Sequence, residues 1–527
     1  MFDQAPPDLH GKNISGSEDI FKPATVEAIL SVGADDAPAI GAPGRPALSY
    51  AGLRELAKQT GAALNAAGIG RSDRVAIVLP NGPEMAAAFL SVACAAATAP
   101  LNPNYKLEEF DFYLGDLDAR ALLVQAGWET PARAAATARN IPVIEVVVGS
   151  GPAGEFTLVV PPGLHASPVP AAPAEPGDTA LILHTSGTTA RPKIVPLSQA
   201  NLAASAANIV RSLALGPADV CLNIMPLFHI HGLIAAVLSS ISAGGSVVCA
   251  PGLSAFRFFN WFKDARPTWY TAVPTMHQTL LELAPRYKDA ISQGRLRFIR
   301  SSSASLPPQV MASLEEVFGV PVIESYGMTE ATHQMASNPL PPAPRFAGSV
   351  GIAAGPEIAI LDDDGNLLPP GKRGEVVIRG GNVTRGYENN PEANRKSFTN
   401  GWFRTGDEGV LDTEGFLRLT GRLKEIINRA GEKISPLEVD NRLMEHPAVK
   451  QVVTFAMPSR LFGEDVAAAV VLHEGASVDV TALRNFVAER LSAFKVPQQI
   501  VFLEEIPKGA TGKLQRIGLA EKLGLSS

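Results

Sequence analysis

Residues 184–193 read His-Thr-Ser-Gly-Thr-Thr-Ala-Arg-Pro-Lys, and this stretch decides how the rest of the chain is interpreted. An apolar run at 180–183 predicts a buried strand before it, and a helical pattern follows it from about residue 199 to 215. The stretch is therefore expected to be a loop that leaves a strand. Hydroxyl groups, inward backbone N–H groups turned by a glycine, and a lysine suit the phosphates of a nucleotide. The residues expected to bind them are Thr185, Ser186, Gly187, Thr188, Thr189 and Lys193.

This loop differs from the phosphate loop of the P-loop nucleotide hydrolases. That loop needs Gly-Lys followed by Ser or Thr, whereas Ile194 follows Lys193 here. A Ser/Thr-rich surface loop without a ligand is the alternative for so short a string. The interpretation therefore depends on whether further motifs follow in the chain.

The composition indicates a multidomain globular protein. The chain has 527 residues, of which 46% are hydrophobic and 18% charged, and a single core stops growing at roughly 250–300 residues. A net charge of −7 argues against a general nucleic-acid binder. Three scattered cysteines and the lack of a visible signal peptide or membrane-spanning run favour the cytoplasm and no membrane partner.

Strands alternating with helices predict an α/β fold with parallel sheets. Residues 74–79, 121–124 and 143–148 are expected to be buried strands, and 51–67 and 84–98 to be helices. From about residue 348 to 423 the pattern changes to short alternating strands, which predicts a small β-rich subdomain. We expect an N-terminal domain over 1–423, followed by an α+β C-terminal domain over 424–527.

Four further stretches carry chemistry when they are taken together. Residues 322–330 read Val-Ile-Glu-Ser-Tyr-Gly-Met-Thr-Glu, and 402–407 read Trp-Phe-Arg-Thr-Gly-Asp. Arg422 stands in Gly-Arg-Leu-Lys-Glu, and 507–513 read Pro-Lys-Gly-Ala-Thr-Gly-Lys. Alone, the Thr-Glu pair is typical of a helix start and the last lysine of a solvated charge. In this order they resemble the motifs of the adenylate-forming superfamily, which includes acyl-CoA synthetases, adenylation domains and luciferases.

The resemblance covers residues from about 20 to 520 and implies ATP, Mg²⁺ and CoA as ligands. The phosphate loop departs from the usual form at Ala190 and Ile194, where glycine is commoner. The implied architecture is a large N-terminal domain and a mobile C-terminal domain that rotates at a hinge near Lys424. A carboxylic acid is activated as an acyl-adenylate and then transferred to a thiol.

The resemblance also implies a role for each matching residue. Thr329 meets the α-phosphate, Glu330 holds Mg²⁺, and Lys513 closes over the α-phosphate during catalysis. Asp407 and Arg422 hold the ribose, and Gly431 permits the close approach of pantetheine. The remaining nucleotide contacts are expected from Glu324, Ser325, Tyr326, which stacks near adenine, and Gly327.

The predicted acid pocket contains too many polar groups for a long alkyl chain. Residues 226–232, 301–306 and 328–335 together resemble the oxalate–CoA ligases. His229, beside the reacting carboxylate, Ser303 and His333 are the implied acid contacts, whereas His231 has no assigned role. Malonate or another short, medium-chain or aryl acid stays open, because one methylene changes discrimination by only ~1–3 kcal/mol.

Two other classes of protein are weighed against this one. An amino-acid adenylation domain would carry an Asp where His229 stands, and a carrier domain would follow, but the sequence ends at Ser527. An inactive protein on the same scaffold would have lost Lys513, Glu330 or Asp407, and all three are present. The sequence leaves a monomer or a homodimer equally open.

Overall fold

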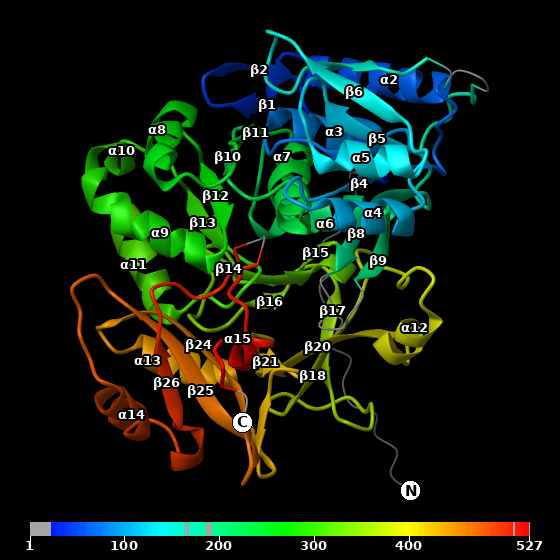
Figure 1. Ribbon diagram of the computed structural model, residues 1–527. Helices are drawn as coiled ribbons and strands as arrows, with labels where there is room; N and C mark the ends of the chain where they lie inside the picture. Colours follow the sequence, from blue (N-terminus) through cyan, green and yellow to red (C-terminus); the bar gives the residue numbers. More distant parts are fainter. Residues whose placement is uncertain (1–22, 163, 165–167, 186–191, 510–511, 526–527) are drawn as a thin grey trace, which may run out of the picture.

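The strands of the protein form four sheets. A computed structural model describes residues 23–162, 164, 168–185, 192–509 and 512–525 (Figure 1). The larger two sheets, of nine and seven strands, are both built from residues before 354. A five-stranded sheet follows, and the last sheet holds the C-terminal strands.

The two large sheets are mainly parallel, with antiparallel strands at their edges. Parallel pairs run through the middle of each sheet, as the sequence predicts, and the fold is therefore mixed α/β. The nine-stranded sheet has the order β16 (Ile352–Ala353), β15 (His333–Ser337), β14 (Val322–Met328), β13 (Phe298–Ser301), β12 (Trp269–Ala272), β10 (Val220–Asn223), β11 (Ser246–Cys249), β1 (Pro38–Ala42) and β2 (Arg45–Ser49). The seven-stranded sheet has the order β7 (Phe156–Val159), β6 (Val143–Val148), β5 (Ala121–Gln125), β3 (Arg74–Val78), β4 (Ala97–Pro100), β8 (Thr179–Thr185) and β9 (Lys193–Ser198).

Helices cover these sheets and fill the space between them. The largest hydrophobic core joins residues of both sheets to the helices α3, α6 and the π-helical segment η2. Ser198 caps α6 by accepting a 3.1 Å hydrogen bond from the N–H of Asn201. The helices are α1 (Val26–Leu30), α2 (Tyr50–Ala66), α3 (Pro83–Ala93), α4 (Leu107–Asp116), α5 (Pro131–Ala138), α6 (Gln199–Ser212), η2 (His231–Leu238), α7 (Ser239–Ser242), α8 (Ala255–Ala265), α9 (Pro274–Leu283), η3 (Ala284–Arg286), α10 (Lys288–Ser292) and α11 (Pro308–Phe318).

The helix predicted over 84–98 is wrong at its C-terminal end. The helix α3 stops at Ala93, and Ala97–Pro100 forms the strand β4. Strand β4 pairs in parallel with β3 and β8 in the interior of the sheet. Alanine favours a helix, but pairing with two neighbouring strands overrides that weak preference.

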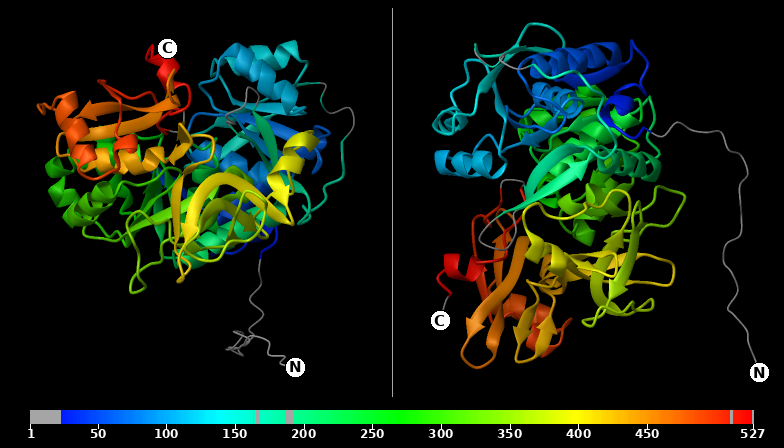
Figure 2. Two further views of the ribbon diagram at one scale, coloured as in Figure 1. Left: turned by 90° about the horizontal axis from the view of Figure 1, so that it is seen from below. Right: turned by 90° about the vertical axis from the view of Figure 1, so that its right-hand side faces the viewer.

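The C-terminal third begins with short strands and ends in a mixed sheet. The five-stranded sheet contains β17 (Glu357–Leu361), β18 (Arg373–Arg379), β19 (Phe398–Thr399), β20 (Trp402–Leu411) and β21 (Leu417–Arg422), with α12 (Pro391–Ser397) beside it. The last sheet contains β22 (Ile427–Arg429), β23 (Glu432–Ile434), β24 (Val449–Ser459), β25 (Gly463–Leu472) and β26 (Gln499–Phe502). Its helical segments are α13 (Pro436–Met444), α14 (Val480–Ala488), η5 (Ala493–Lys495) and α15 (Leu519–Lys522). Figure 2 shows these orange and red elements gathered beside the green ones.

No helix within the described ranges is both long and apolar enough to cross a membrane.

Candidate functional site

The carboxyl ends of four parallel strands meet at one edge of the nine-stranded sheet. Strands β10, β12, β13 and β14 are hydrogen-bonded neighbours that run in the same direction. The predicted acid-binding residues His229 and Ser303 follow β10 and β13, and Glu330 follows β14. Open α/β sheets bind ligands at this edge. The fold therefore brings together segments that lie about a hundred residues apart in the sequence.

Glu330 is a buried carboxylate that a tyrosine holds in place. It lies in the short helical turn η4 (Thr329–Ala331) directly after β14, and only 6% of its surface is exposed. The hydroxyl of Tyr387 donates a 2.7 Å hydrogen bond to its Oε1 atom. Burial raises the pKa of Glu330, whereas the bond from Tyr387 and the charge of Lys193 lower it. Tyr387, in the stretch Gly-Tyr-Glu-Asn, is not among the residues predicted from the sequence.

Lys193 lies close to this carboxylate. Its Nζ atom sits 4.3 Å from the centre of the Tyr387 ring, a cation–π contact. Burial and the charge of Lys424 lower the pKa of Lys193, while Glu330 raises it. The charge of Lys193 therefore acts on the predicted metal ligand, and Lys424 lies near enough to act on Lys193, although Lys193 begins β9 and Lys424 precedes β22.

The predicted ribose contacts form a second cluster. Asp407 and Arg422 are register partners on β20 and β21, and the Arg422 Nε donates to Asp407 Oδ1 at 3.1 Å. The hydroxyl of Tyr326 donates a hydrogen bond to the other carboxylate oxygen, Oδ2. Asp407 is nearly fully buried, and a carboxylate held from two sides in this way is well placed to accept hydrogen bonds from a diol.

Lys513 reaches this cluster from the C-terminal segment. The sequence predicts an exposed lysine, but the side chain is half-buried, because the preceding turn docks on α9. There the hydroxyl of Thr275 donates a 2.8 Å hydrogen bond to the carbonyl of Gly512. Burial and then the charge of Arg422 lower the pKa of Lys513 to about 8, while Asp407 and Glu330 raise it. Lys513 is therefore near both predicted nucleotide clusters.

The predicted acid contacts are linked through His231. Its Nδ1 atom lies 3.0 Å from the hydroxyl of Ser303, and its Nε2 atom lies 2.6 Å from the hydroxyl of Thr271. The ring of His333 lies 5.1 Å from the ring of His231, centre to centre. The Nδ1 atom of His229 accepts a 3.3 Å hydrogen bond from the N–H of His231. His231, which has no role assigned from the sequence, thus holds Ser303 in place.

Two of the predicted acid contacts have a strained backbone. Ser303 has φ 74° and His333 has φ 94°, a region that non-glycine residues rarely adopt. Such strain persists only where the surrounding structure imposes it, and it concentrates at functional sites. Burial lowers the pKa of His229 to about 3 and holds the pKa of His231 and His333 well below the usual range. All three imidazoles are therefore neutral near pH 7.

Arg300 is a fully buried cation that the sequence interpretation missed. It lies on β13, two residues before Ser302, and its Nη2 atom donates a 3.1 Å hydrogen bond to Gln334 Oε1. The Nε and Nη1 atoms have no hydrogen-bond partner among the residues that the structure describes. Arg300 directly follows the apolar pair Phe298-Ile299 in the sequence, which was a visible signal, because buried charges are rare without a purpose.

Strand β14 carries the remaining predicted nucleotide contacts. Glu324 is buried and accepts a 2.9 Å hydrogen bond from the N–H of Leu306, and burial raises its pKa to about 8. The hydroxyl of Ser325 lies 3.4 Å from the carbonyl of Ser301. A Cβ atom at Gly327 would lie 1.7 Å from the carbonyl oxygen of His333, so only glycine lets β14 and β15 meet here. The side chain of Glu324 is therefore mainly protonated and neutral near pH 7.

Other predicted contacts lie at the margins of this site. Thr185 ends β8 and pairs with Lys193 across the loop, whereas Ser186, Gly187, Thr188 and Thr189 lie outside the described residues. Gly431 stands in the exposed turn between β22 and β23, with φ 95°. Its N–H donates a 3.1 Å hydrogen bond to Asn428 Oδ1.

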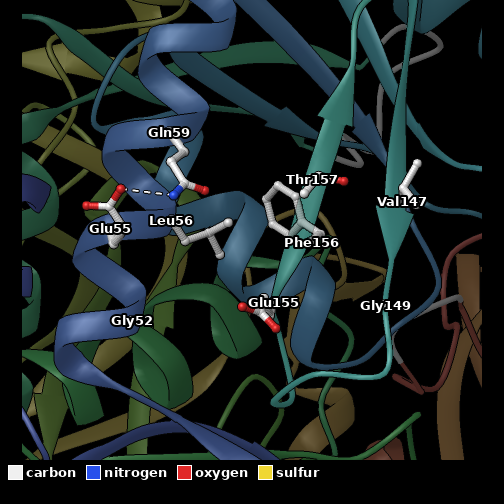
Figure 3. Close-up of a pocket in the computed structure, with 9 residues that line it drawn as sticks. All are labelled: Gly52, Glu55, Leu56, Gln59, Val147, Gly149, Glu155, Phe156 and Thr157. Carbon is white, nitrogen blue, oxygen red and sulfur yellow. Dashed lines mark hydrogen bonds between the residues drawn. The ribbon is translucent and has the colours of Figure 1, made fainter.

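A surface hollow between α2 and the strands β6 and β7 is separate from this site (Figure 3). It is lined by Gly52, Glu55, Leu56, Gln59, Val147, Gly149, Glu155, Phe156 and Thr157, none of which is a predicted site residue. Its only ionisable side chains are two glutamates, so nothing in it suits an anionic nucleotide.

Comparisons with known proteins show the family of this chain. The sequence pattern of the AMP-binding enzyme family matches residues 31–388, and that of the AMP-binding enzyme C-terminal domain matches 438–513. The chain belongs to the AMP-binding enzyme family. An oxalate–CoA ligase of Arabidopsis thaliana is 46% identical over 91% of this chain and 94% of its own. One of Saccharomyces cerevisiae is 43% identical over 87% of this chain and 88% of its own.

Solved structures place the fold in the same family. ATP-bound MatB from Rhodopseudomonas palustris superimposes with a TM-score of 0.84 at 29% identity, over 95% of this chain and 99% of that one. The site described above therefore belongs to an AMP-binding enzyme, as the motif order predicts.

Proposed function

We propose that this AMP-binding enzyme ligates oxalate to CoA at the expense of ATP, through an oxalyl-adenylate. The observation that carries the proposal is a cluster of polar side chains at the carboxyl edge of the sheet, in which His231 fixes Ser303 beside His333. We call these three residues the acid wall, because we expect them to face the substrate acid. A half-buried hydroxyl and buried imidazoles suit a small acid with a second polar end and would be costly against an alkyl chain. The similarity to oxalate–CoA ligases of a plant and a yeast supports oxalate among such acids.

The first step forms the adenylate. One oxygen of the acid attacks the α-phosphorus of ATP, the bond to the bridging oxygen of the β-phosphate breaks, and pyrophosphate leaves. Lys513, Lys193 and the hydroxyl of Thr329 are the groups that would stabilise negative charge on the phosphates as it develops. Asp407, held by Tyr326 and Arg422, would fix the ribose and so orient the nucleotide.

Glu330 is suited to hold Mg²⁺ together with the phosphates. No group of three or more His, Cys, Asp or Glu side chains within the described ranges could form a metal cage of protein ligands alone. Mg²⁺ commonly binds one carboxylate plus substrate phosphates, and Tyr387 occupies only one oxygen of Glu330. When bound there, the ion would neutralise phosphate charge.

The second step transfers the acyl group. The thiol sulfur of CoA attacks the activated carbonyl, the carbon–oxygen bond to AMP breaks, and AMP leaves. In the present arrangement Lys513 lies near Asp407 and Glu330, and Gly431 lies in an exposed turn. We propose that the domain after about residue 424 rotates near Lys424, removes Lys513 and brings Gly431 to the pantetheine path.

The test is AMP formation that depends on both ATP and CoA, measured with oxalate, malonate, acetate, octanoate and a coumarate. The proposal expects a strong preference for oxalate. A preference for octanoate or coumarate would refute the polar pocket while keeping the adenylate chemistry. Formation of AMP with an amino acid and no CoA would instead indicate an adenylation domain.

A further inference from the structure

The guanidinium of Arg300 is buried without a counter-charge. None of its surface is exposed, and within the described ranges no carboxylate forms an ion pair with it. In the described part of the chain only Nη2 has a hydrogen-bond partner, the neutral amide oxygen of Gln334, at 3.1 Å. An unpaired buried charge costs several kcal/mol, so a purely structural role would favour a neutral side chain here.

The surrounding structure orients that amide toward the cation. The Gln334 Nε2 atom donates to the hydroxyl of Ser212 at 3.0 Å and to the carbonyl of Ala354 at 3.1 Å. With both N–H donors used, the amide oxygen is left to face Arg300. The amide of Gln334 is therefore fixed in an orientation that binds this cation, although no described residue neutralises the charge of the cation.

Two chains of contact join Arg300 to the acid wall. Thr271 is its register partner on β12, so the two side chains lie on the same face of the sheet, and Thr271 hydrogen-bonds His231. On the other side Gln334 directly follows His333, whose Nδ1 atom is buried without a partner. The charge of Arg300 contributes to the low pKa of His231 and of His333.

Because both histidines are neutral, neither can act as a counter-charge for the second acidic group of the substrate. His231 and His333 can donate or accept hydrogen bonds near pH 7, but they carry no charge. Lys513, the other cation whose charge reaches them, is assigned to the phosphates and leaves with the C-terminal domain. Arg300 is the fixed positive charge that stays beneath the acid wall.

We propose that Arg300 is a specificity-determining residue, whose buried guanidinium is the counter-charge for a second anionic group on the acid. This inference rests on the proposed function and adds the chemical class of the acid: small, with two negative charges. A carboxylate beside the His231 and His333 rings would supply the charge that the free protein lacks. Arg300 acts through the field and through Thr271 and Gln334, so it is a positioning residue rather than a catalytic one.

The experiment compares each diacid with its monoamide, which has nearly the same shape but one charge fewer. The measured quantity is the ratio of kcat/KM for oxalate over oxamate, and for malonate over malonamate. We expect the wild type to prefer the better diacid strongly. Arg300→Gln should lower that ratio about tenfold to a hundredfold, mainly through KM of the diacid, because one unit charge is lost in a site of low dielectric constant. Arg300→Lys should restore most of the ratio.

Two controls separate charge from structure. Arg297→Met removes a cation from the start of the same strand, where Arg297 is paired with Asp219, and should leave the ratio unchanged. Melting temperature and ATP affinity report whether each variant is folded. The inference is overturned if Arg300→Gln lowers kcat equally for diacid and monoamide, since that is the effect of a merely structural residue.

The wild-type measurement can decide the proposal even if a variant does not fold. A wild type that uses oxamate or malonamate as well as the diacid overturns the role of Arg300 without any mutant. A wild type that prefers malonate, with a high diacid-to-monoamide ratio, would refute oxalate as the substrate and still support Arg300. The two failures are therefore distinguishable.

Discussion

The hydroxyl of Tyr387 donates a 2.7 Å hydrogen bond to the Oε1 atom of Glu330. Tyr387 follows strand β18 of a five-stranded sheet. Glu330 lies in the turn after β14, more than fifty residues earlier in the sequence. The bond favours the ionised form of a carboxylate whose burial raises its pKa. Since Mg²⁺ binds the ionised form, Tyr387 should govern the metal requirement.

We therefore expect Tyr387→Phe to raise the Mg²⁺ concentration for half-maximal adenylation about tenfold, since a hydrogen bond to a charged group contributes about 1.5–3 kcal/mol. The measurement is a Mg²⁺ titration of oxalate-dependent pyrophosphate exchange. Tyr287→Phe, which removes a hydroxyl from a half-buried position outside the site, is the matched control. An unchanged Mg²⁺ midpoint would contradict the metal assignment of Glu330.

Lys513→Ala should separate the two half-reactions. The charge is lost only from the adenylation arrangement, so adenylate formation should fall about 10²–10³-fold. Thioester formation from preformed oxalyl-AMP should stay within about threefold of the wild type. Both rates are measured by rapid quench, and an equal loss in both would show that Lys513 is structural. Lys508→Ala, at a neighbouring lysine paired with Glu505, is the control.

The pKa of Lys513 predicts the alkaline limit of adenylation. Burial lowers that pKa to about 8, and the protonated form is the one that stabilises phosphate charge. The kcat/KM for ATP in the adenylation half-reaction should therefore be full below pH 7 and fall tenfold per unit well above pH 8. Lys513→Arg should move the fall to higher pH, because a guanidinium stays protonated. A flat profile to pH 10 in the wild type would be evidence against the assignment.

Asp407→Asn tests the ribose assignment. The neutral amide keeps the shape but accepts from only one oxygen, so the apparent KM for ATP should rise about tenfold. Selectivity for the ribose hydroxyls is the more specific measurement. The wild type should prefer ATP to 2′,3′-dideoxy-ATP, and the variant should lose most of that preference. Asp412→Asn, in a turn further along the same sheet, should behave as the wild type. Retained selectivity in Asp407→Asn would place the ribose elsewhere.

The helix α9 holds the C-terminal domain in the present arrangement. Besides the bond from Thr275, Glu282 forms a 2.7 Å ion pair with Lys450, and the Gln278 amide donates to the Lys450 carbonyl at 3.2 Å. Glu282→Lys replaces the attraction with repulsion and should slow adenylation about three- to tenfold, since exposed pairs are weak. Thioester formation from preformed adenylate should not slow.

The matched control for this variant is Glu316→Lys on α11, which makes the same change in net charge at an exposed position. If both variants slow adenylation alike, the effect is one of overall charge. If Glu282→Lys slows the two half-reactions equally, the contacts of α9 do not select between domain positions.

The sequence by itself determined the family and predicted most of the candidate site residues. Hydrophobic periodicity predicts buried strands of the seven-stranded sheet, because a strand covered on both faces must be apolar whatever its neighbours. The motifs could be recognised in the sequence because hydroxyl groups, glycines and charges cluster in short stretches, as at 184–193 and 322–330. Local pattern failed at Ala97–Pro100, where pairing with two strands overrides a helical composition.

Only the tertiary structure decided which groups act together. It showed that Tyr387 orients Glu330, that His231 orients Ser303, and that two nitrogen atoms of the buried Arg300 have no hydrogen-bond partner among the described residues. It also replaced an exposed Lys513 with a half-buried one docked on α9. Hydrogen bonds, burial and electrostatic fields depend on distances between residues far apart in the chain, and residue order does not contain those distances.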